Sequence, residues 1–417
     1  MAVTPPPQYE VVLFGATGFT GKLCAEYIYR KLPNDLRWAV AGRSQDKLTS
    51  VLDTLRSKDD SRALPAIEVC GLGADQAHEL AQKAKVVIST VGPYQSYGES
   101  MFQACAETGT HYLDCTGETP WIVDMIAKYE AIAKRTGAIM IPSCGFDSVP
   151  SDISAFVVVN HIRTKLSSHT AKVDSSLHEI KGRASGGTVR SAINAFDLYS
   201  LPELFKRMAP FSLSPRHPAR SYQQKSSFAA KIFGLHHISG LGWMAINPQG
   251  LIDRCYVNRS WGLVADSEPA TYGENFDFHA WIRMSGPIRA MLWHFTLVIS
   301  LMLFCVSPIR WLVTRFCFKS GDGPNESFRQ KCSFEYRTSG IADNAQGQQV
   351  IGRLMFNGDP YLFTALCLGE VALLLSRDAS TLTRLQGGGI LTTAQLGSTF
   401  LDRLEKNGVQ IEIQEVI

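Results

Sequence analysis

The chain has 417 residues, of which 45% are hydrophobic and 19% charged, and its formal net charge is +3. This length favours two domains with sizeable cores. The small net charge, without a dense basic stripe, excludes the nucleic-acid-binding classes. The ten cysteines form no CxxC pair and no Cys/His cluster at zinc spacing, so we expect reduced thiols, a cytoplasmic protein and no metal site. The opening residues MAVTPPPQYE lack the apolar stretch of a signal peptide.

The first apolar strand runs directly into three glycines. Residues 11–21 read VVLFGATGFTG, with the spacing G-x-x-G-x-x-G that some dinucleotide-binding folds use. In such a turn the glycines permit a tight bend and a close approach of pyrophosphate, and the following helix presents free N–H groups. A purely structural glycine turn is the alternative. The pattern predicts cofactor contacts from Gly15, Ala16, Thr17, Gly18, Phe19, Thr20 and Gly21.

The end of the second strand indicates which dinucleotide binds. An NAD site usually places an acidic residue there for the ribose 2′-OH. This chain has Arg43, followed by Ser44 and Lys47. A planar guanidinium, a hydroxyl and a second cation suit a 2′-phosphate, so we predict NADP(H). The alternative is a solvated Arg43 beside a helix that Ser44 caps.

Strand and helix patterns alternate from the glycine loop to about residue 142. We expect strands over 36–41, 67–72, 85–91, 111–114 and 138–141, and helices over 22–32, 98–109 and 119–136. This alternation predicts a Rossmann-type, doubly wound parallel sheet with ligands at the carboxyl ends of its strands. Gly92 and Pro93, after the fourth of the six strands, are expected beside the nicotinamide ribose.

Five motifs occupy the first 152 residues: GATGFTG (15–21), AGRS (41–44), VGPY (91–94), YLDCTGE (112–118) and PSCGFDSVPSD (142–152). Together they resemble the saccharopine dehydrogenase-like oxidoreductases, and most closely the branch that includes trans-acting enoyl reductases. The resemblance continues in glycine-containing motifs at 186–188, 321–324, 358–361 and 387–392, so it covers most of the chain. The chain departs from the family pattern in having no glycine between Pro360 and Tyr361, and in having Thr393 where proline is usual.

The resemblance implies an α/β architecture in three parts. Residues 1–150 would form the NADP-binding Rossmann domain, and residues 151–358 a second α/β domain with a mixed sheet. Residues 359–417 would return to pack on the first domain. The sequence agrees in two places, because 363–376 reads as an apolar core helix and 331–358 alternates like two strands around a turn.

The resemblance also implies reduction, by NADPH, of a C=C bond in an acyl or polyketide chain of lipid or secondary-metabolite biosynthesis, carried by a partner synthase. Hydride addition to an enoyl thioester leaves an enolate, which needs an oxyanion donor and a proton. Tyr94 and Tyr97 after the fourth strand, and Asp147 after the sixth, are the candidate catalytic residues. Alternatively, the tyrosines cover the cofactor ring and Asp147 orders a loop with Ser148.

Residues 288–318 are unusually apolar for the second domain of a reductase. Between 290 and 306 the only ionisable side chain besides Cys305 is His294, and Arg310, Trp311 and Arg315 follow. A helix that is apolar all round must be buried in protein or lipid. The segment therefore predicts contact with a membrane or lipid surface. A core helix or a homodimer interface is the alternative.

Two other function classes stay open at this point. One is a C=N reductase of saccharopine type, for which a carboxylate-binding pocket would need several of the basic residues between 160 and 260: Arg163, Lys165, Lys181, Arg183, Arg190, Arg207, Arg216, Arg220 and Lys225. The other is a non-catalytic, membrane-associated protein that binds NADP(H) as a structural ligand. Turnover of an α,β-unsaturated thioester would separate the enoyl reductase from both.

Overall fold

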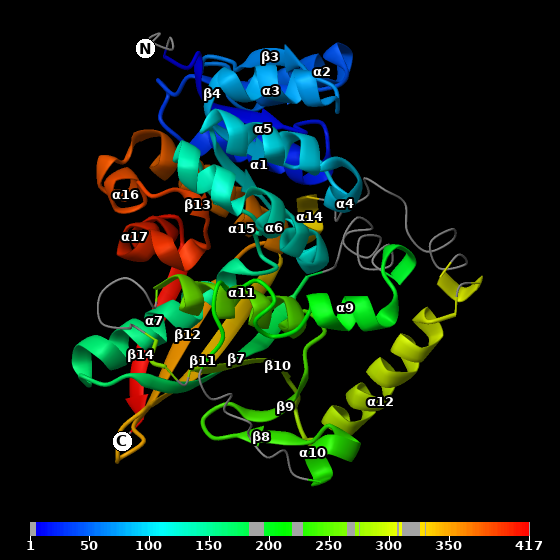
Figure 1. Cartoon of the computed structure of the whole chain (residues 1–417), viewed down its shortest axis with the longest axis vertical. Coiled ribbons are helices and arrows are strands. Elements are labelled where there is room, and N and C mark those ends of the chain that lie inside the picture. The colour runs from blue at the N-terminus through cyan, green and yellow to red at the C-terminus, as the bar shows by residue number, and fades with distance from the viewer. Residues whose placement is uncertain are drawn as a thin grey trace. The chain divides into compact units, whose positions relative to one another are not determined.

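The computed structural model divides the chain into two compact units. The first comprises Met1–Phe146 and Tyr361–Asn407, and the second comprises Asp147–Pro360 and Gly408–Ile417. Figure 1 shows the course of the chain. The structure describes residues 6–182, 196–218, 228–264, 272–274, 276–306, 308–310, 326–329 and 331–416.

The first unit is built on a parallel sheet, which confirms the predicted fold class. Among the described residues this sheet has seven strands in the order β13-β6-β5-β4-β1-β2-β3. The order reverses between β1 and β4, and in such sheets the ligand lies outside the carboxyl ends of the strands at that point. The strands are β1 (Tyr9–Phe14), β2 (Trp38–Gly42), β3 (Ala66–Val69), β4 (Ala84–Ser89), β5 (His111–Asp114), β6 (Ile139–Ile141) and β13 (Gly389–Ile390).

Helices connect these strands, and several of them end where the sequence changes to glycine. Both α5 and α6 stop at a left-handed glycine, Gly109 and Gly137, which is the usual helix C-cap. The N-terminal helices are α1 (Phe19–Lys31), α2 (Gln45–Lys58), α3 (Ala74–Gln82), α4 (Tyr94–Tyr97), α5 (Glu99–Thr108) and α6 (Thr119–Thr136). The C-terminal segment adds α15 (Pro360–Arg377), α16 (Ala379–Arg384), the 3-10 turn η1 (Thr393–Leu396) and α17 (Gly397–Lys406).

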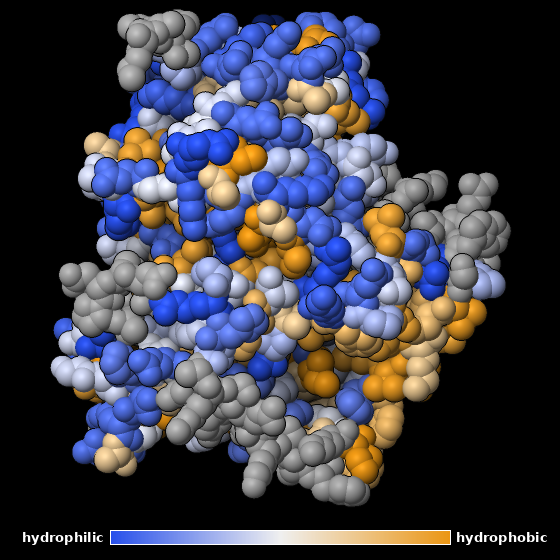
Figure 2. All heavy atoms as spheres, viewed as in Figure 1, coloured by the Kyte–Doolittle hydropathy of each residue, from blue (hydrophilic) through white to orange (hydrophobic). Residues whose placement is uncertain are grey.

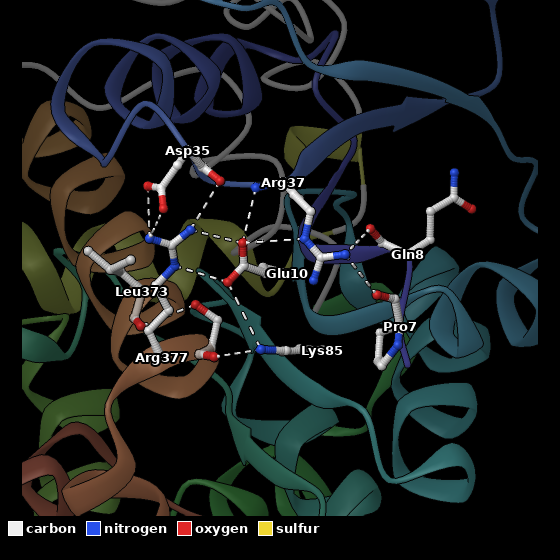
Figure 3. Close-up of polar contacts among 9 residues, drawn as sticks. Pro7, Gln8, Glu10, Asp35, Arg37, Lys85, Leu373 and Arg377 are labelled. Carbon is white, nitrogen blue, oxygen red and sulfur yellow. Dashed lines mark hydrogen bonds and ion pairs between the residues drawn. The ribbon is translucent and has the colours of Figure 1, made fainter. Parts of the chain in front are cut away.

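The C-terminal end of α15 is tied to β1 by a cluster of ion pairs, drawn in Figure 3. Arg377 donates to both carboxylate oxygens of the buried Glu10 at 2.9 Å and to Asp35 at 3.0 Å. Lys85 donates to the carbonyl of Ser376 at 3.1 Å. Hydrogen bonds from Arg377 hold the pKa of Glu10 below its usual range. These contacts join residues from 291 to 367 positions apart into one folded unit.

The second unit has a mixed sheet of seven described strands in the order β14-β12-β11-β7-β10-β9-β8. The pair β10 and β7 is parallel and the other pairs are antiparallel. The strands are β7 (Thr170–Lys181), β8 (His236–Ile238), β9 (Gly242–Ile246), β10 (Asp277–Arg283), β11 (Ser333–Ala342), β12 (Gln349–Phe356) and β14 (Val409–Val416). The sequence placed the whole of 359–417 with the first domain; the structure differs because β14 pairs with β12.

Two helices supply the core of the second unit. Helix α7 (Val149–Lys165) packs on β7, β11 and β12, and α11 (Gly250–Val264) packs on β10 and on α7. The largest core cluster of this unit places Val159 of α7 and Trp261 of α11 around Phe278 of β10. The other described helices of this unit are α9 (Leu201–Arg207), α10 (Phe228–Phe233), α12 (Pro287–Phe304) and α14 (Glu326–Arg329).

Candidate functional site

The turn after β1 has the backbone geometry of a dinucleotide loop. Gly15 has φ +92°, a left-handed value that favours glycine. A Cβ on Gly21 would stand 2.2 Å from the carbonyl oxygen of Gly15, so no side chain fits there. A Cβ on Gly18 would meet nothing closer than 3.5 Å. Packing thus explains two of the three glycines, and the bare backbone at Gly18 faces space that a ligand can occupy.

The helix that follows this turn is open to an anion at its N-terminus. Gly18 is the N-cap of α1, no side chain caps the helix, and its first turn contains no acidic residue. The first amides of an α-helix have no acceptor within the helix and carry partial positive charge. Residues 15–21 therefore fit the pyrophosphate of a dinucleotide, as the sequence predicted.

The residues expected to recognise the 2′-phosphate follow β2. Arg43 is exposed, and within the described chain its guanidinium contacts no protein acceptor. The hydroxyl of Ser44 caps α2 by accepting the N–H of Lys47 at 3.4 Å, and the Lys47 side chain is exposed. The capping role therefore belongs to Ser44, while Arg43 and Lys47 remain available to a phosphate. No carboxylate stands at the end of β2 to bind a ribose 2′-OH.

The turn after β4 closes the same edge of the sheet. Thr90 donates its N–H to Phe14 at 2.8 Å, so the ends of β1 and β4 are held together where the strand order reverses. A cis peptide bond joins Gly92 to Pro93. The buried carboxylate of Glu118 accepts the next two N–H groups, those of Tyr94 at 3.1 Å and Gln95 at 2.8 Å. Glu118 thus anchors the turn.

The two candidate tyrosines lie in different environments. Tyr94 is 6% exposed, packs on Trp121, and donates its hydroxyl to the carbonyl of Ser89 at 3.0 Å. Burial raises the pKa of Tyr94 well above its usual value. Tyr97 is 48% exposed, and within the described residues its hydroxyl has no protein partner. The hydroxyl of Tyr94 therefore already donates to a protein acceptor, whereas the hydroxyl of Tyr97 can donate to a ligand.

A buried carboxyl group joins the loops after β5 and β6. Asp114 is fully buried and accepts N–H groups of Thr116 at 2.9 Å and Ser143 at 2.8 Å. The backbone of Ser143 has φ +57°, and its hydroxyl donates to the carbonyl of Thr116 at 2.7 Å. Burial raises the pKa of Asp114 to about 7. Asp114 therefore clamps together the loops that follow two neighbouring strands.

In the second unit, Asp147 is half-buried just before α7 and lies near two buried carboxyls, those of Asp152 and Asp253. Burial raises the pKa of Asp147 to about 6. The pKa of Asp253, in α11, is raised well above its usual value by burial and by the charges of Asp147 and Asp152. Asp152 accepts the hydroxyl proton of Ser260 at 2.5 Å, and the carbonyl of Asp147 accepts the amide of Gln249 at 2.8 Å. These bonds tie α7 to α11.

The sequence did not identify Asp253 as a site residue, because its local pattern is that of a polar residue on the outer face of a helix. Its burial follows from the packing of α11 on α7, and periodicity alone does not show that packing. Several other expected residues lie outside the described residues: the motifs 186–188 and 321–324, and Arg183, Arg190, Arg220, Lys225, Trp311 and Arg315.

Comparison with known proteins shows what the chain is similar to. Residues 11–141 match the saccharopine dehydrogenase NADP binding domain. A trans-acting enoyl reductase of Mycobacterium ulcerans is 30% identical over 426 residues, covering 97% of both chains. One of Mycobacterium leprae is 29% identical over 436 residues, again covering 97% of both. Among solved structures, saccharopine dehydrogenase (L-Glu forming) of Saccharomyces cerevisiae superposes with a TM-score of 0.58 at 10% identity, covering 98% of this chain and all of the other.

Proposed function

The chain belongs to the saccharopine dehydrogenase-like family of trans-acting enoyl reductases, and we propose that it reduces a C=C bond of an acyl or polyketide chain that a partner synthase carries. The NADP-binding domain makes it an NADP-dependent oxidoreductase. Similarity to trans-acting enoyl reductases over nearly the whole chain is the observation that carries the proposed reaction. The term trans-acting in the relatives' names supports a substrate presented by another protein.

The chain's own residues would hold the cofactor at the first sheet. The amides of the first turn of α1 would bind the pyrophosphate, and the open space at Gly18 would let it approach the backbone. Arg43 and Lys47 would bind the 2′-phosphate, and the turn at Gly92 and Pro93 would lie beside the nicotinamide ribose. When bound, NADPH supplies the hydride that adds to the β-carbon of the enoyl group.

The protein must then bind the enolate oxygen and return a proton to the α-carbon. Tyr97 suits this donation because its hydroxyl is unused, and Asp147 suits it because a carboxyl with a pKa of about 6 still holds some proton near neutrality. Tyr94 is better suited to a positioning role, since its hydroxyl and its N–H fix the turn after β4. The products are the saturated acyl chain and the oxidised cofactor.

The C=N reductase alternative needs a cluster of cations that face a substrate. Arg163, Lys165 and Lys181 are exposed, and Lys181 pairs with Glu179 at 3.3 Å. Arg207 stacks over the ring of Tyr199 at 4.7 Å. Three of these four cations are thus solvated and the fourth stacks on an aromatic ring, which favours the enoyl reductase.

NADPH and NADH binding to the purified protein tests the cofactor arrangement, with Arg43→Ala as the variant and Arg56→Ala as the control. Arg56 is an exposed arginine on the same helix as Lys47. We expect Arg43→Ala to lose about 10- to 100-fold in NADPH affinity and little in NADH affinity, because a hydrogen bond to a charged group is lost. Equal losses in both variants would contradict this assignment.

Oxidation of NADPH in the presence of enoyl thioesters tests the reaction. We expect consumption of NADPH to require the conjugated double bond, and a saturated thioester of the same length is the control. Tyr97→Phe and Asp147→Asn should each be compared with wild type at saturating NADPH. A protein that binds NADPH but turns over no enoyl thioester, free or carrier-bound, would refute the proposed reaction.

The remaining part of the proposal concerns location. The sequence predicted lipid contact through 288–318, and the structure describes residues 288–306 and 308–310 of that segment. We propose that this segment contacts a lipid surface, where an apolar acyl substrate would also gather. Two described helices are long and apolar enough to cross a membrane, α12 and α15.

A further inference from the structure

Helix α12 presents a continuous apolar stripe to the outside of the second unit. The exposed positions Ile288, Leu292, Phe295, Ile299 and Met302 follow one another at steps of three or four residues, which places them on one face of a helix. Ile288 is 69% exposed and Met302 65% exposed. Figure 2 shows the apolar surface gathered over this helix. Of the residues of α12, Ala290 alone is buried.

The opposite face of α12 is attached to its own unit at several points. The indole of Trp293 donates to the carbonyl of Ile246 in β9 at 3.0 Å. His294 packs so closely against Gly234, just after α10, that a Cβ there would stand 2.5 Å from the imidazole. At the other end, the rings of Phe304 and Phe196 stack with centroids 6.4 Å apart. The stripe therefore faces outward on a helix that is attached at Trp293 and His294 and again at Phe304.

These attachments indicate whether α12 lies on a membrane or crosses it. A crossing helix would draw its neighbours β9 and α10 into the hydrocarbon. Strand β9 lies next to β8, the last described strand of its sheet, and open sheet edges that face lipid do not occur in the hydrocarbon region. A helix held on one side by a folded unit and apolar on the other fits the plane of the interface.

A neighbouring helix carries further exposed apolar side chains. In α10, which contacts α12, Ile232 and Phe233 are exposed. Large exposed apolar patches mark interaction sites, because monomeric proteins seldom leave such areas in water.

The charges beside the stripe favour an anionic surface. From residue 278 to residue 310 the sequence contains three arginines and no carboxylate. Arg283 and Arg289 are both exposed, and Arg289 lies in the first turn of α12. Basic residues at the edge of an apolar face bind the phosphates of anionic lipids while the apolar side chains enter the acyl boundary.

We propose that the outer stripe of α12 binds the surface of an anionic phospholipid membrane, with the helix axis in the membrane plane, the stripe immersed and Arg283 and Arg289 at the phosphates. This deepens the lipid contact of the proposed function by naming the face, the orientation and the lipid charge. The arrangement holds the enzyme on one leaflet without spanning it.

Flotation of the full-length protein with phosphatidylcholine vesicles that contain phosphatidylserine tests this orientation. The variant is the double substitution Ile299→Glu and Met302→Glu. The control is Ser57→Glu and Ser398→Glu, two exposed positions in the first unit that change the net charge equally. We expect wild type and control to float and the stripe variant to lose at least about 100-fold in vesicle partitioning.

A second variant tests the charges. Arg283→Gln with Arg289→Gln should lose about tenfold or more on vesicles containing phosphatidylserine, and little on pure phosphatidylcholine. Equal partitioning of the stripe variant and the control would overturn the proposal. So would failure of wild type to float, a dimer in solution that the stripe variant splits, or resistance of bound wild type to extraction at alkaline pH, which indicates spanning.

NADPH binding measured on the same variants separates this inference from the enzyme reaction. The stripe variant should bind NADPH as wild type does. Its thermal unfolding should also match that of the control, which shows that the second unit has folded. Loss of flotation with intact NADPH binding and turnover would leave the reductase standing. Conversely, flotation of wild type without turnover would refute the reaction and leave the membrane contact intact.

Discussion

Helices α12 and α15 are similar in length and hydropathy but differ strongly in how much of each is buried. Each has 18 residues, and their mean hydropathies are 1.5 and 1.3. Yet 6% of α12 is buried, against 83% of α15. Apolar content therefore shows that a helix must leave water, and its contacts alone show whether protein or another partner covers it.

The polar contacts of the two helices explain the difference. Arg377 at the end of α15 pairs with the buried Glu10, and Glu370 in its middle accepts from Tyr27 at 2.7 Å and from Arg403 at 2.8 Å. In α12, Trp293 is half-buried and gives one hydrogen bond to a carbonyl. A core helix is fixed by partners from several elements, and a surface helix by one side only.

Identical truncations should give the largest contrast between them. Leu368 in α15 is fully buried, and Leu292 in α12 is 59% exposed. We expect Leu368→Ala to cost about 2–5 kcal/mol of unfolding free energy because it leaves a cavity, and Leu292→Ala to change it by less than about 0.5 kcal/mol. Denaturant unfolding of both variants measures this. Similar losses would mean that α12 is covered by protein in solution.

Removing the arginine near the end of each helix should give the next largest contrast. Arg377→Ala leaves Glu10 buried without its main partner, and we expect a loss of about 2–4 kcal/mol. Arg310→Ala breaks a pair whose aspartate is half exposed, which is worth about 0–1 kcal/mol. Thermal unfolding of the two variants checks the order, and an equal shift of both midpoints would argue against it.

Lowering the pH should weaken the contact between Arg377 of α15 and Glu10. Helix α12 carries no carboxylate that acid could neutralise. The pKa of Glu10 is lowered in the folded chain, so its contribution is present above the usual 4.5 and is lost as the pH falls through the folded-state value. At neutral pH we expect Glu10→Gln to be about 1.5–3 kcal/mol less stable than wild type. That difference should narrow as unfolding is measured at successively lower pH. A constant difference would show that the charge of Glu10 is not what stabilises the contact.

Single hydrogen-bond deletions should give the smallest contrast. Tyr27→Phe removes a bond to the buried Glu370, and we expect a cost of about 1–2 kcal/mol. Trp293→Phe removes a bond at an exposed position, with a cost of about 0.5–1 kcal/mol. The double variant Tyr27→Phe with Arg403→Ala should cost less than the sum of the single changes, because both donors serve Glu370. Additive losses would contradict that shared role.

Much of the first unit could be predicted because its signals are local. The run VVLFGATGFTG forms β1, its turn and the start of α1, and the helix expected over 119–136 is α6. A glycine turn, a strand of apolar residues and a left-handed glycine cap are each specified by a few neighbouring residues. The NADP preference was visible for the same reason, since Arg43 stands at the end of a recognisable strand.

Other features depend on contacts between residues far apart in the chain. The sequence alone determined the parallel sheet, the glycine turn after its first strand and the existence of two long apolar helices. Only the tertiary structure decided that Tyr94 donates its hydroxyl to Ser89, that Asp253 is buried, that β14 joins the second sheet, and which face of α12 is exposed. The reason is physical: periodicity records which side chains avoid water, whereas burial is conferred by partners that the local sequence does not contain.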